Sequence, residues 1–422
     1  MNRTQLANGV HSTVLPAEKF KRCRVAVYFL WPSRRETATA EALLPLLMER
    51  SYADCPDMTE LSKRLAALYG ASLSVDMSTL GANRVLSVSV SGIQDAYALE
   101  GEKLSAQYAA MALGVAFRPR LVHGLFDAQD VAIEKEQLQE LLESEINDKR
   151  GYCLRQARRR YYGVAPEGIE RYGYLEEVEA LTPAAVTNAW HSMIGTAQIE
   201  VMVLGADEAV VRESVLQALK NIDRAPTALA APCAMPRIEP QRCTEVLDTV
   251  QGKLCLLFTA GEPVAEKDYA ALRVATALLG GTPTSRLFMN VREKRSLCYY
   301  CAASGTARNG VLCIDSGVEH ANAAAAREAV LEELAALQNG PMTQQELDET
   351  KRSLVCALES VEDTLSGVEG WYFSEICRDS AKSPRETIAD INAVTAQEVG
   401  AALRRFSLSV EYLLTKEGST NV

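Results

Sequence analysis

The chain has 422 residues, which is too long for one ordinary hydrophobic core and predicts two or more domains. Hydrophobic residues make up 48% and charged residues 23%, a normal balance for a soluble globular protein. The net charge of −11 argues against nucleic acid as the main partner, and no apolar run long enough to span a membrane is present.

The first half of the chain predicts a strand, a helix, a hairpin and two more helices. The strand is an apolar run at residues 24–31, and an apolar helical pattern follows over residues 38–52. Residues 70–92 alternate apolar and polar side chains on both sides of a turn, which indicates a hairpin. Helical patterns then cover residues 95–113 and 126–146.

The second half repeats this order. A strand at residues 253–260 precedes a helix at 266–281 and a hairpin at 297–318, whose turn signal is Arg308-Asn309-Gly310. A long helix follows over residues 321–340 and stops at Asn339-Gly340-Pro341.

The next helix opens with a predicted capping box, in which Thr343 is the cap and Glu346 is the third helical residue. The repeated order predicts an α+β fold of two homologous sandwich halves, each a mostly antiparallel sheet covered on one face by helices. The proline-containing segment 225–241 reads as a linker between domains 1–224 and 242–422. A cleft shared by two such halves is the natural ligand site.

The cysteine pattern predicts free thiols rather than disulfides. The chain has eleven cysteines, and its N-terminus shows no apolar signal region, which favours a reducing, cytoplasmic compartment. Cys298 and Cys301 have C-x-x-C spacing, but residues three apart on a strand face opposite sides, which argues against a metal or redox pair.

The usual catalytic motifs are missing from the sequence. No H-E-x-x-H, H-x-x-E-H, G-x-S-x-G or phosphate-binding loop occurs. The four histidines show no metal-binding spacing, so each is expected to be structural or exposed: His11, His123, His191 and His320. The basic run at residues 158–160 is expected to form a solvated helix face.

The stretch GGTPTSRLFMNVREKRSLCY, residues 280–299, contains the strongest candidate site. Its helix is expected to end near residues 294–296, with Tyr299 at the start of the following strand. Arg292 and Tyr299 could then converge at the mouth of the cleft and donate hydrogen bonds to a developing oxyanion. The alternative is that both residues have only structural roles, with the arginine in a surface ion pair and the tyrosine half-buried on the strand.

This stretch resembles the C-terminal-domain signature of insulinase-type (pitrilysin-like, inverzincin) zinc metallopeptidases. The segment 339–354 and the opening Leu6-Ala7-Asn8-Gly9-Val10 also resemble that family. The resemblance implies that Arg292 and Tyr299 polarise the scissile carbonyl. It also implies substrate binding near Gly280, Gly281 and Ser285, although the two glycines fit a helix cap equally well.

The same resemblance implies that the zinc motif is lost. Active members carry H-x-x-E-H on the helix after the first strand, where two His bind zinc and Glu acts as the base. Leucine occupies both ligand positions and the base position here: Leu43, Leu47 and Leu46. Pro45 would also disturb a helix built to hold two ligands.

The family's third ligand, a glutamate further along the chain, aligns with Leu141 here. Glu140 and Glu143 are close enough to leave that alignment open.

The resemblance therefore implies a catalytically incomplete subunit that binds no metal. It would supply Arg292, Tyr299 and a chamber wall to a zinc-bearing sister subunit that processes a peptide or protein, in a heterodimer. Three alternatives remain open at this point: a scaffold protein of the same fold, a hydrolase with a different site, and a zinc peptidase active as a homodimer.

Overall fold

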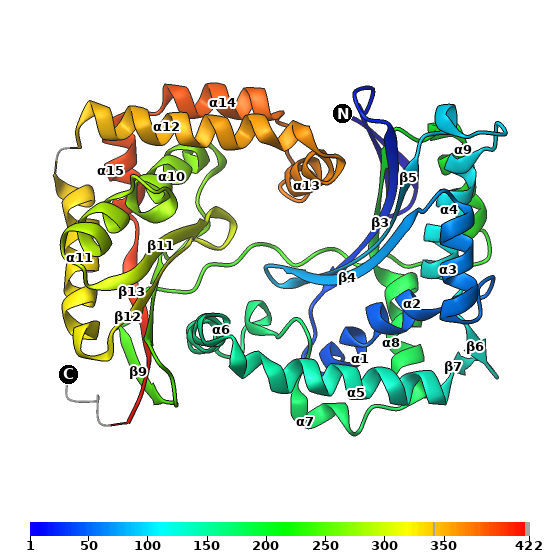
Figure 1. Ribbon diagram of the computed structural model, residues 1–422, viewed down its shortest axis with the longest axis horizontal. Coiled ribbons are helices and arrows are strands. Elements are labelled where there is room, and N and C mark those ends of the chain that lie inside the picture. Colours follow the sequence, from blue (N-terminus) through cyan, green and yellow to red (C-terminus); the bar gives the residue numbers. More distant parts are fainter. Residues whose placement is uncertain (341, 418–422) are drawn as a thin grey trace. The chain divides into compact units, whose positions relative to one another are not determined.

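The computed structural model describes residues 1–340 and 342–417, which form two compact units (Figure 1). Unit 1 comprises Met1–Glu143, Ile169–Ala231 and Glu362–Ala381. Unit 2 comprises Ser144–Gly168, Pro232–Val361 and the chain from Lys382 onward. Each unit takes one segment from the other half of the sequence, so a single division at the linker does not give these units. Pro341 of the predicted stop signal lies outside the described residues.

Unit 1 is built on a six-stranded sheet. Its strands, in spatial order, are β1 (Asn2–Ala7), β2 (Val10–Leu15), β8 (Gln198–Leu204), β3 (Arg22–Pro32), β5 (Asn83–Ile93) and β4 (Ser72–Leu80). The β2/β8 pair is parallel and the other pairs are antiparallel. The predicted first strand is β3, and the predicted hairpin is β4/β5, so both predictions are confirmed.

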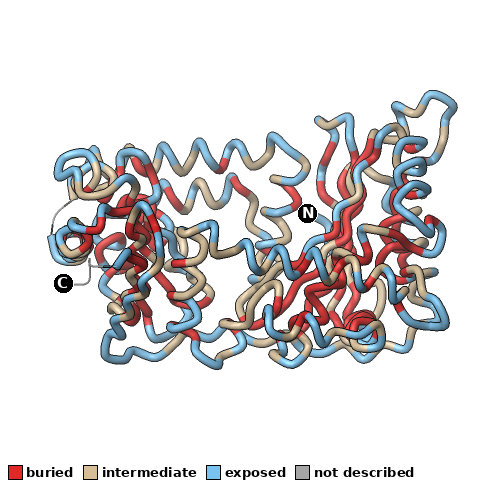
Figure 2. Tube along the Cα trace, turned by 60° about the horizontal axis from the view of Figure 1, so that its bottom comes forward, coloured by how far each residue is buried: buried red, intermediate tan, exposed pale blue. Residues whose placement is uncertain are grey.

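The helices of unit 1 pack mainly against one face of this sheet. They are α1 (Ala38–Ala42), α2 (Leu44–Arg50), α3 (Met58–Ala67), α4 (Leu104–Phe117), α5 (Ala128–Ser144), α7 (Leu175–Val178), α8 (Pro183–Thr196) and α9 (Glu208–Leu219), with a small ribbon of β6 (Leu121–Val122) and β7 (Leu125–Phe126). The core lies between helices and sheet, where β3 contributes Val25, Val27 and Phe29 (Figure 2).

Two predicted helices of unit 1 differ from the observed ones. Within the segment 95–113, a 3₁₀ turn at Asp95–Tyr97 comes first and the α-helix begins only at Leu104, because Gly101 adopts a left-handed backbone with φ of 73° and interrupts the pattern. The segment 38–52 forms two short helices that divide at Leu43, with Pro45 in the first turn of the second. Proline is tolerated there because the first N–H groups of a helix have no intrahelical partner.

Unit 2 is built on a five-stranded sheet. Its strands, in spatial order, are β11 (Cys298–Thr306), β12 (Val311–Val318), β10 (Gly252–Thr259), β13 (Ser407–Thr415) and β9 (Gln241–Val246), and only the β13/β9 pair is parallel. The predicted strand at 253–260 is β10, and the predicted hairpin is β11/β12. Gly310 takes the left-handed turn conformation with φ of 57°, as its turn signal predicts.

The helices of unit 2 include α10 (Tyr269–Thr276), α11 (Ala323–Asn339), α12 (Gln344–Glu359), α14 (Pro384–Ala393) and α15 (Ala396–Arg404). Two π-helical segments, Ala277–Gly281 and Leu287–Lys294, lie between α10 and β11. The predicted capping box is confirmed, since the Glu346 N–H donates to Thr343 Oγ1 at 3.1 Å and the Thr343 N–H donates to Glu346 Oε2 at 2.8 Å.

Helix α13 (Leu365–Ile376) comes from the C-terminal half of the sequence but belongs to unit 1. It packs Val368 on the second face of the sheet, against Ala26 and Met202. The Tyr28 hydroxyl donates to Glu369 Oε1 at 2.7 Å, and Arg24 forms an ion pair with the same carboxylate. The predicted single-sided covering is therefore incomplete, because this face receives a helix that is distant in sequence.

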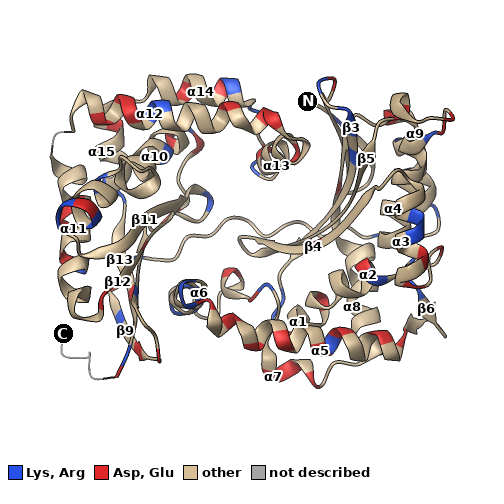
Figure 3. Cartoon of the chain, in the orientation of Figure 1, with Lys and Arg blue, Asp and Glu red and all other residues tan. Residues whose placement is uncertain are grey.

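Helix α6 (Lys149–Tyr162) makes the reverse exchange into unit 2. Its buried residues Tyr161 and Tyr162 pack in one cluster with Leu257 and Val410 of the sheet. The arginines at 158–160 are exposed on the same helix, as predicted, and α6 carries basic residues in Figure 3. An apolar stripe facing the sheet and a charged stripe facing water account for this helix.

Candidate functional site

Arg292 lies near the end of the π-helical segment Leu287–Lys294, which leads into β11. Its guanidinium carbon lies 4.5 Å from the centre of the Phe288 ring, one turn earlier. Its Nε lies 3.6 Å from Glu293 Oε1, and the side chain is 39% exposed. The ring supports the long side chain while the charged end remains in contact with water.

The chain reverses between Arg292 and the strand. Ser296 has a left-handed backbone with φ of 51°, which costs a non-glycine residue about 1–3 kcal/mol. Its N–H donates to the Arg292 carbonyl at 3.1 Å, and the Leu297 N–H donates to the Val291 carbonyl at 3.2 Å. These bonds satisfy the last carbonyls of the segment, which ends at Lys294, within the predicted range.

Tyr299 is the extra residue of a β-bulge at the start of β11. Cys298 pairs with Val318 and Tyr300 pairs with Gly317, so β11 advances two residues while β12 advances one. A bulge re-aims a side chain and locally ends regular pairing. The Tyr299 side chain points outward as a result and is 51% exposed.

Glu319, the residue after β12, holds the phenol of Tyr299. The Tyr299 hydroxyl donates to Glu319 Oε1 at 3.2 Å, and this bond raises the pKa of Tyr299 above its usual value. Glu319 lies outside the sequence motif and was not predicted as a site residue. The predicted hairpin could have revealed it, because the residue after the second strand must lie opposite the start of the first.

Arg292 and Tyr299 line one pocket of about 360 Å³. The other lining residues are Glu293, Ser296, Leu297, Cys298 and Glu319. The structure thus brings the two predicted donors together. Both groups can hydrogen-bond to an oxygen that gains negative charge. The phenol has a single proton, which here is donated to Glu319.

Gly280, Gly281 and Ser285 are not among the described residues that line the pocket. A Cβ on Gly280 would lie 2.6 Å from the Ala303 backbone nitrogen, so this glycine permits close packing of the helical segment on β11. Around Gly281, the nearest atoms to such a Cβ are 3.5 Å away. Ser285 is only 1% exposed. A role in substrate binding stays a prediction for all three.

The three positions that the resemblance assigns to the zinc motif lie in the core of unit 1 or against it. Leu43 and Leu47 are buried, and Leu46 packs against the same apolar cluster. The Leu47 N–H donates to the Leu43 carbonyl at 3.2 Å, so the two lie one turn apart across the division between α1 and α2. Hydrocarbon side chains cannot ligate zinc or transfer a proton, so the residues present do not fit a zinc site.

A buried ion pair stands beside these leucines. Arg84, which is fully buried, places its Nε 3.0 Å from Glu41 Oε2. Glu41 also accepts hydrogen bonds from Trp31 Nε1 at 3.1 Å and Thr37 Oγ1 at 2.7 Å. The Arg84 guanidinium donates further to two backbone carbonyls, at residues 170 and 171. This network is a structural element, because a buried charge is tolerated only when it is paired and hydrogen-bonded.

The candidate positions for the family's distal glutamate lie on α5. Leu141, Glu140 and Glu143 are all exposed. The buried carboxylate of this helix is Glu134, which forms an ion pair with Arg50 at 3.0 Å. Within residues 1–340 and 342–417, no three His, Cys, Asp or Glu side chains are grouped so that they could hold a metal ion.

The predicted separation of Cys298 and Cys301 is wrong. Cys298 pairs with Val318 and Cys301 pairs with Ser316, and alternate residues of β12 lie on one face. The bulge at Tyr299 adds one residue to β11, so the two cysteines share a face although they are three apart in sequence. The sequence gives no signal for this bulge, because neither glycine nor proline marks it.

The histidines occupy structural or partly exposed positions. His320 is buried, with Nδ1 2.9 Å from Thr415 Oγ1 and Nε2 3.1 Å from the Thr249 carbonyl oxygen. The His191 ring packs on Trp190, and burial lowers the pKa of His11. None of them lines the Arg292 pocket.

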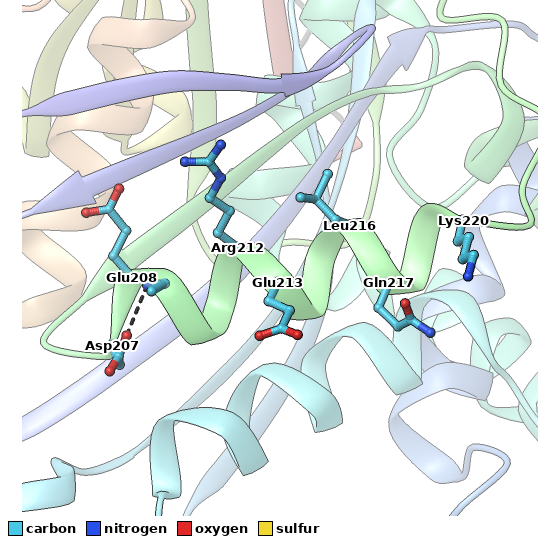
Figure 4. A pocket seen from close by; sticks show the side chains of 8 residues that line it. Asp207, Glu208, Arg212, Glu213, Leu216, Gln217 and Lys220 are labelled. Atoms are coloured by element: carbon cyan, nitrogen blue, oxygen red, sulfur yellow. Dashed lines mark hydrogen bonds between the residues drawn. The ribbon is translucent and has the colours of Figure 1, made fainter.

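A larger hollow of about 810 Å³ runs beside α9 (Figure 4). It is lined by residues of that one helix and its cap, Asp207, whose carboxylate accepts the Ala209 N–H at 3.0 Å. Arg212 and Glu213 point to different sides of the helix in Figure 4. The hollow therefore lacks the convergent polar groups expected of a reaction site.

Solved structures share this architecture. A conserved protein from Enterococcus faecalis V583 matches with a TM-score of 0.90 and 29% identity over 100% of this chain and 99% of that one. A peptidase M16 inactive domain from Pseudomonas fluorescens matches with a TM-score of 0.78 and 18% identity over 98% and 97%. A protease from Helicobacter pylori matches with a TM-score of 0.81 and 16% identity over 98% and 99%. The fold is that of M16-type peptidases.

Sequence comparison defines the relationship more closely. A protein-family model described as "Peptidase M16 inactive domain" matches residues 180–354. "Probable inactive metalloprotease YmfF" of Bacillus subtilis is 26% identical over 407 residues, 96% of each chain. "Uncharacterized zinc protease YmxG" of the same organism is 31% identical over 173 residues, 40% of this chain and 42% of that protein. The chain is thus similar over residues 180–354 to the M16 inactive-domain model, and over most of its length to a protein named a probable inactive metalloprotease.

No helix within the described ranges is both long enough and apolar enough to cross a membrane.

Proposed function

We propose that this chain is the non-catalytic subunit of a two-chain zinc peptidase, in which it presents Arg292 and Tyr299 to a peptide carbonyl. A zinc-bearing sister subunit of the same family would supply the metal and the general base. The observation that carries the proposal is a contrast. Two hydrogen-bond donors line one open pocket, whereas buried or partly buried leucines occupy the zinc-motif positions.

The pocket suits a carbonyl oxygen that becomes negatively charged. The Arg292 guanidinium is permanently charged and has five N–H donors, of which one side faces Glu293. Tyr299 becomes a second donor when its hydroxyl breaks the hydrogen bond to Glu319 and turns toward the substrate. Removing one donor of this kind typically lowers turnover by about 10²–10³-fold.

Glu319 acts as a positioning residue in this proposal. Its carboxylate accepts the Tyr299 hydroxyl and keeps the exposed ring at the pocket. The ring would otherwise be free to rotate, because an exposed side chain at a bulge has few packing contacts.

The relatives support the two-chain arrangement. Bacillus subtilis has one relative named inactive and one named a zinc protease. Two such chains in one organism match the division of labour proposed here. We place the pair in the cytoplasm, because the eleven free cysteines of this chain suit a reducing compartment.

The test is reconstitution with a zinc-bearing family member encoded in the same genome. The purified pair is assayed on a mixture of quenched fluorescent peptides. Arg292→Ala/Tyr299→Phe should lower kcat by about 10²–10³-fold or more with little change in KM, because the donors act mainly on the transition state. Arg295→Ala is the matched control, since Arg295 pairs with Glu332 at 2.8 Å and does not line the pocket.

Three results would contradict the proposal. Full turnover by the assembled double variant supports a scaffold role instead. Chelator-resistant turnover by the isolated chain supports a hydrolase with a different site. Stoichiometric zinc in the isolated chain supports a homodimeric zinc peptidase.

A further inference from the structure

Cys298 and Cys301 form an asymmetric pair of thiols at the Arg292 pocket. The bulge places both on one face of β11. Cys298 lines the pocket and is partly exposed, whereas Cys301 is buried two pairing steps further along the strand. One thiol is therefore accessible to a small molecule, and the second lies behind it.

The surroundings of the two thiols also give them different pKa values, and the accessible thiol has the lower one. Hydrogen bonds with Cys301 and then Ser316, together with the smaller effect of the Arg292 charge, lower the pKa of Cys298 to about 7. The pKa of Cys301 is raised well above its usual value, first by its hydrogen bond with Cys298 and then by burial. Burial raises the pKa of Cys23 and of Cys153 to about 12, which is the usual state of a buried structural thiol. Cys298 is thus the more acidic thiol of the pair.

We propose that this pocket is a thiol–disulfide exchange site, in which Cys298 attacks a low-molecular-weight disulfide and Cys301 resolves the product. Among the residues that line the pocket, Arg292 is positive and Glu293 and Glu319 are negative, so a zwitterionic disulfide such as oxidised glutathione can pair its carboxylates and its ammonium groups there. The proposal concerns thiol chemistry and does not rest on a role in peptide hydrolysis.

The reaction proceeds in two balanced steps. The Cys298 thiolate attacks one sulfur of the disulfide, the S–S bond breaks, and the departing thiolate takes a proton from water. The Cys301 thiol then gives its proton to water and attacks the Cys298 sulfur; the mixed S–S bond breaks, and the second small molecule leaves as a thiolate and takes up a proton. Two protein thiols are oxidised to one disulfide, while one external disulfide is reduced to two thiols.

The disulfide would enclose only Tyr299 and Tyr300. The two cysteines face Val318 and Ser316, which are two residues apart on β12. This is a wide span for a disulfide, so the bulge must tighten as the bond forms. A bond formed at such a strained site is readily reduced, which fits a reversible site rather than a structural one.

The first experiment treats the full chain with oxidised glutathione at pH 7, alkylates the remaining thiols and examines tryptic peptide 296–308 by mass spectrometry. The wild-type peptide should carry no alkyl group, and its mass should be two hydrogen atoms below that of the unmodified dithiol peptide. Cys301→Ser should retain one glutathione on Cys298, because no resolving thiol is present. Cys298→Ser should gain no adduct in this peptide. Thermal melting of both variants verifies that they fold.

Two outcomes overturn the proposal. In the first, Cys298 of the Cys301→Ser variant gains no glutathione while the exposed Cys233 and Cys356 react, which shows that Cys298 is not an exchange site. In the second, the wild-type chain accumulates the glutathione adduct on Cys298, which shows that Cys301 does not resolve it.

A second measurement needs no variant. The rate of iodoacetamide labelling at Cys298 should reach half its maximum near pH 7, whereas labelling at Cys233 and Cys356 should keep rising above pH 8, because an ordinary exposed thiol has a pKa of about 8.5. A half-maximum for Cys298 above pH 8 contradicts the proposal.

Discussion

The turn around Leu43 and the pocket around Arg292 are the two regions to which the family resemblance assigns catalytic residues, and they contain different kinds of side chain. Leu43 and its neighbours lie in an apolar core beside the buried ion pair of Arg84 and Glu41. Arg292, Tyr299 and Glu319 instead form an open polar group. The first region contributes to stability, and the second contributes little, because exposed polar contacts are worth about 0–1 kcal/mol. Folding therefore accounts for the residues of the first region but not for those of the second.

The strongest test of this contrast is the buried ion pair. Glu41→Ala should lower the free energy of unfolding by about 3–5 kcal/mol, because it leaves the fully buried Arg84 guanidinium without its carboxylate. Denaturant unfolding measures the effect. Glu60→Ala removes an exposed ion pair, with Lys63 at 2.8 Å, and should cost about 0–1 kcal/mol. Equal effects of the two substitutions would mean that the network beside Leu43 is not structural.

The leucine at the first ligand position should behave as an ordinary core residue. Leu43→Ala should lower the free energy of unfolding by about 2–5 kcal/mol, because it removes buried methyl groups and leaves a cavity. Leu99→Ala is the matched control at a side chain that is 87% exposed, and it should change stability by no more than about 0.5 kcal/mol. A loss below about 1 kcal/mol for Leu43→Ala would contradict the view that the former ligand position has become core.

The two glycines before the Arg292 segment separate packing from substrate contact. Gly280→Ala should cost about 1–3 kcal/mol, because the added Cβ meets the Ala303 backbone nitrogen at 2.6 Å. Gly281→Ala should change the free energy of unfolding by less than about 1 kcal/mol, since the nearest atoms are 3.5 Å away. The measurement is thermal unfolding of both variants. Similar effects at the two positions would remove the packing explanation for Gly280.

Strands β3 and β10, the two hairpins and the capping box followed from the sequence because each depends on local periodicity or on cap residues. The exchange of α6 and α13 between units could not be predicted, because periodicity marks an apolar face but not the sheet that covers it. Arg292 and Tyr299 could be named from the motif. The bulge could not, and it determines both where Tyr299 points and why Cys298 and Cys301 share a face.

The smallest effect is expected at Glu319, where the polar region can be changed without disturbing the fold. Glu319→Gln removes the negative charge that favours the neutral phenol, so the pKa of Tyr299 should fall toward its usual value of about 10. Tyr299 then deprotonates at lower pH in the variant than in the wild type. Tyrosinate absorbance measures this, with Tyr299→Phe in each background identifying the contribution of this residue. The free energy of unfolding near neutral pH should change by less than about 0.5 kcal/mol, because both side chains are exposed. An unchanged Tyr299 titration would show that Glu319 does not hold the phenol, and would remove its positioning role at the Arg292 pocket.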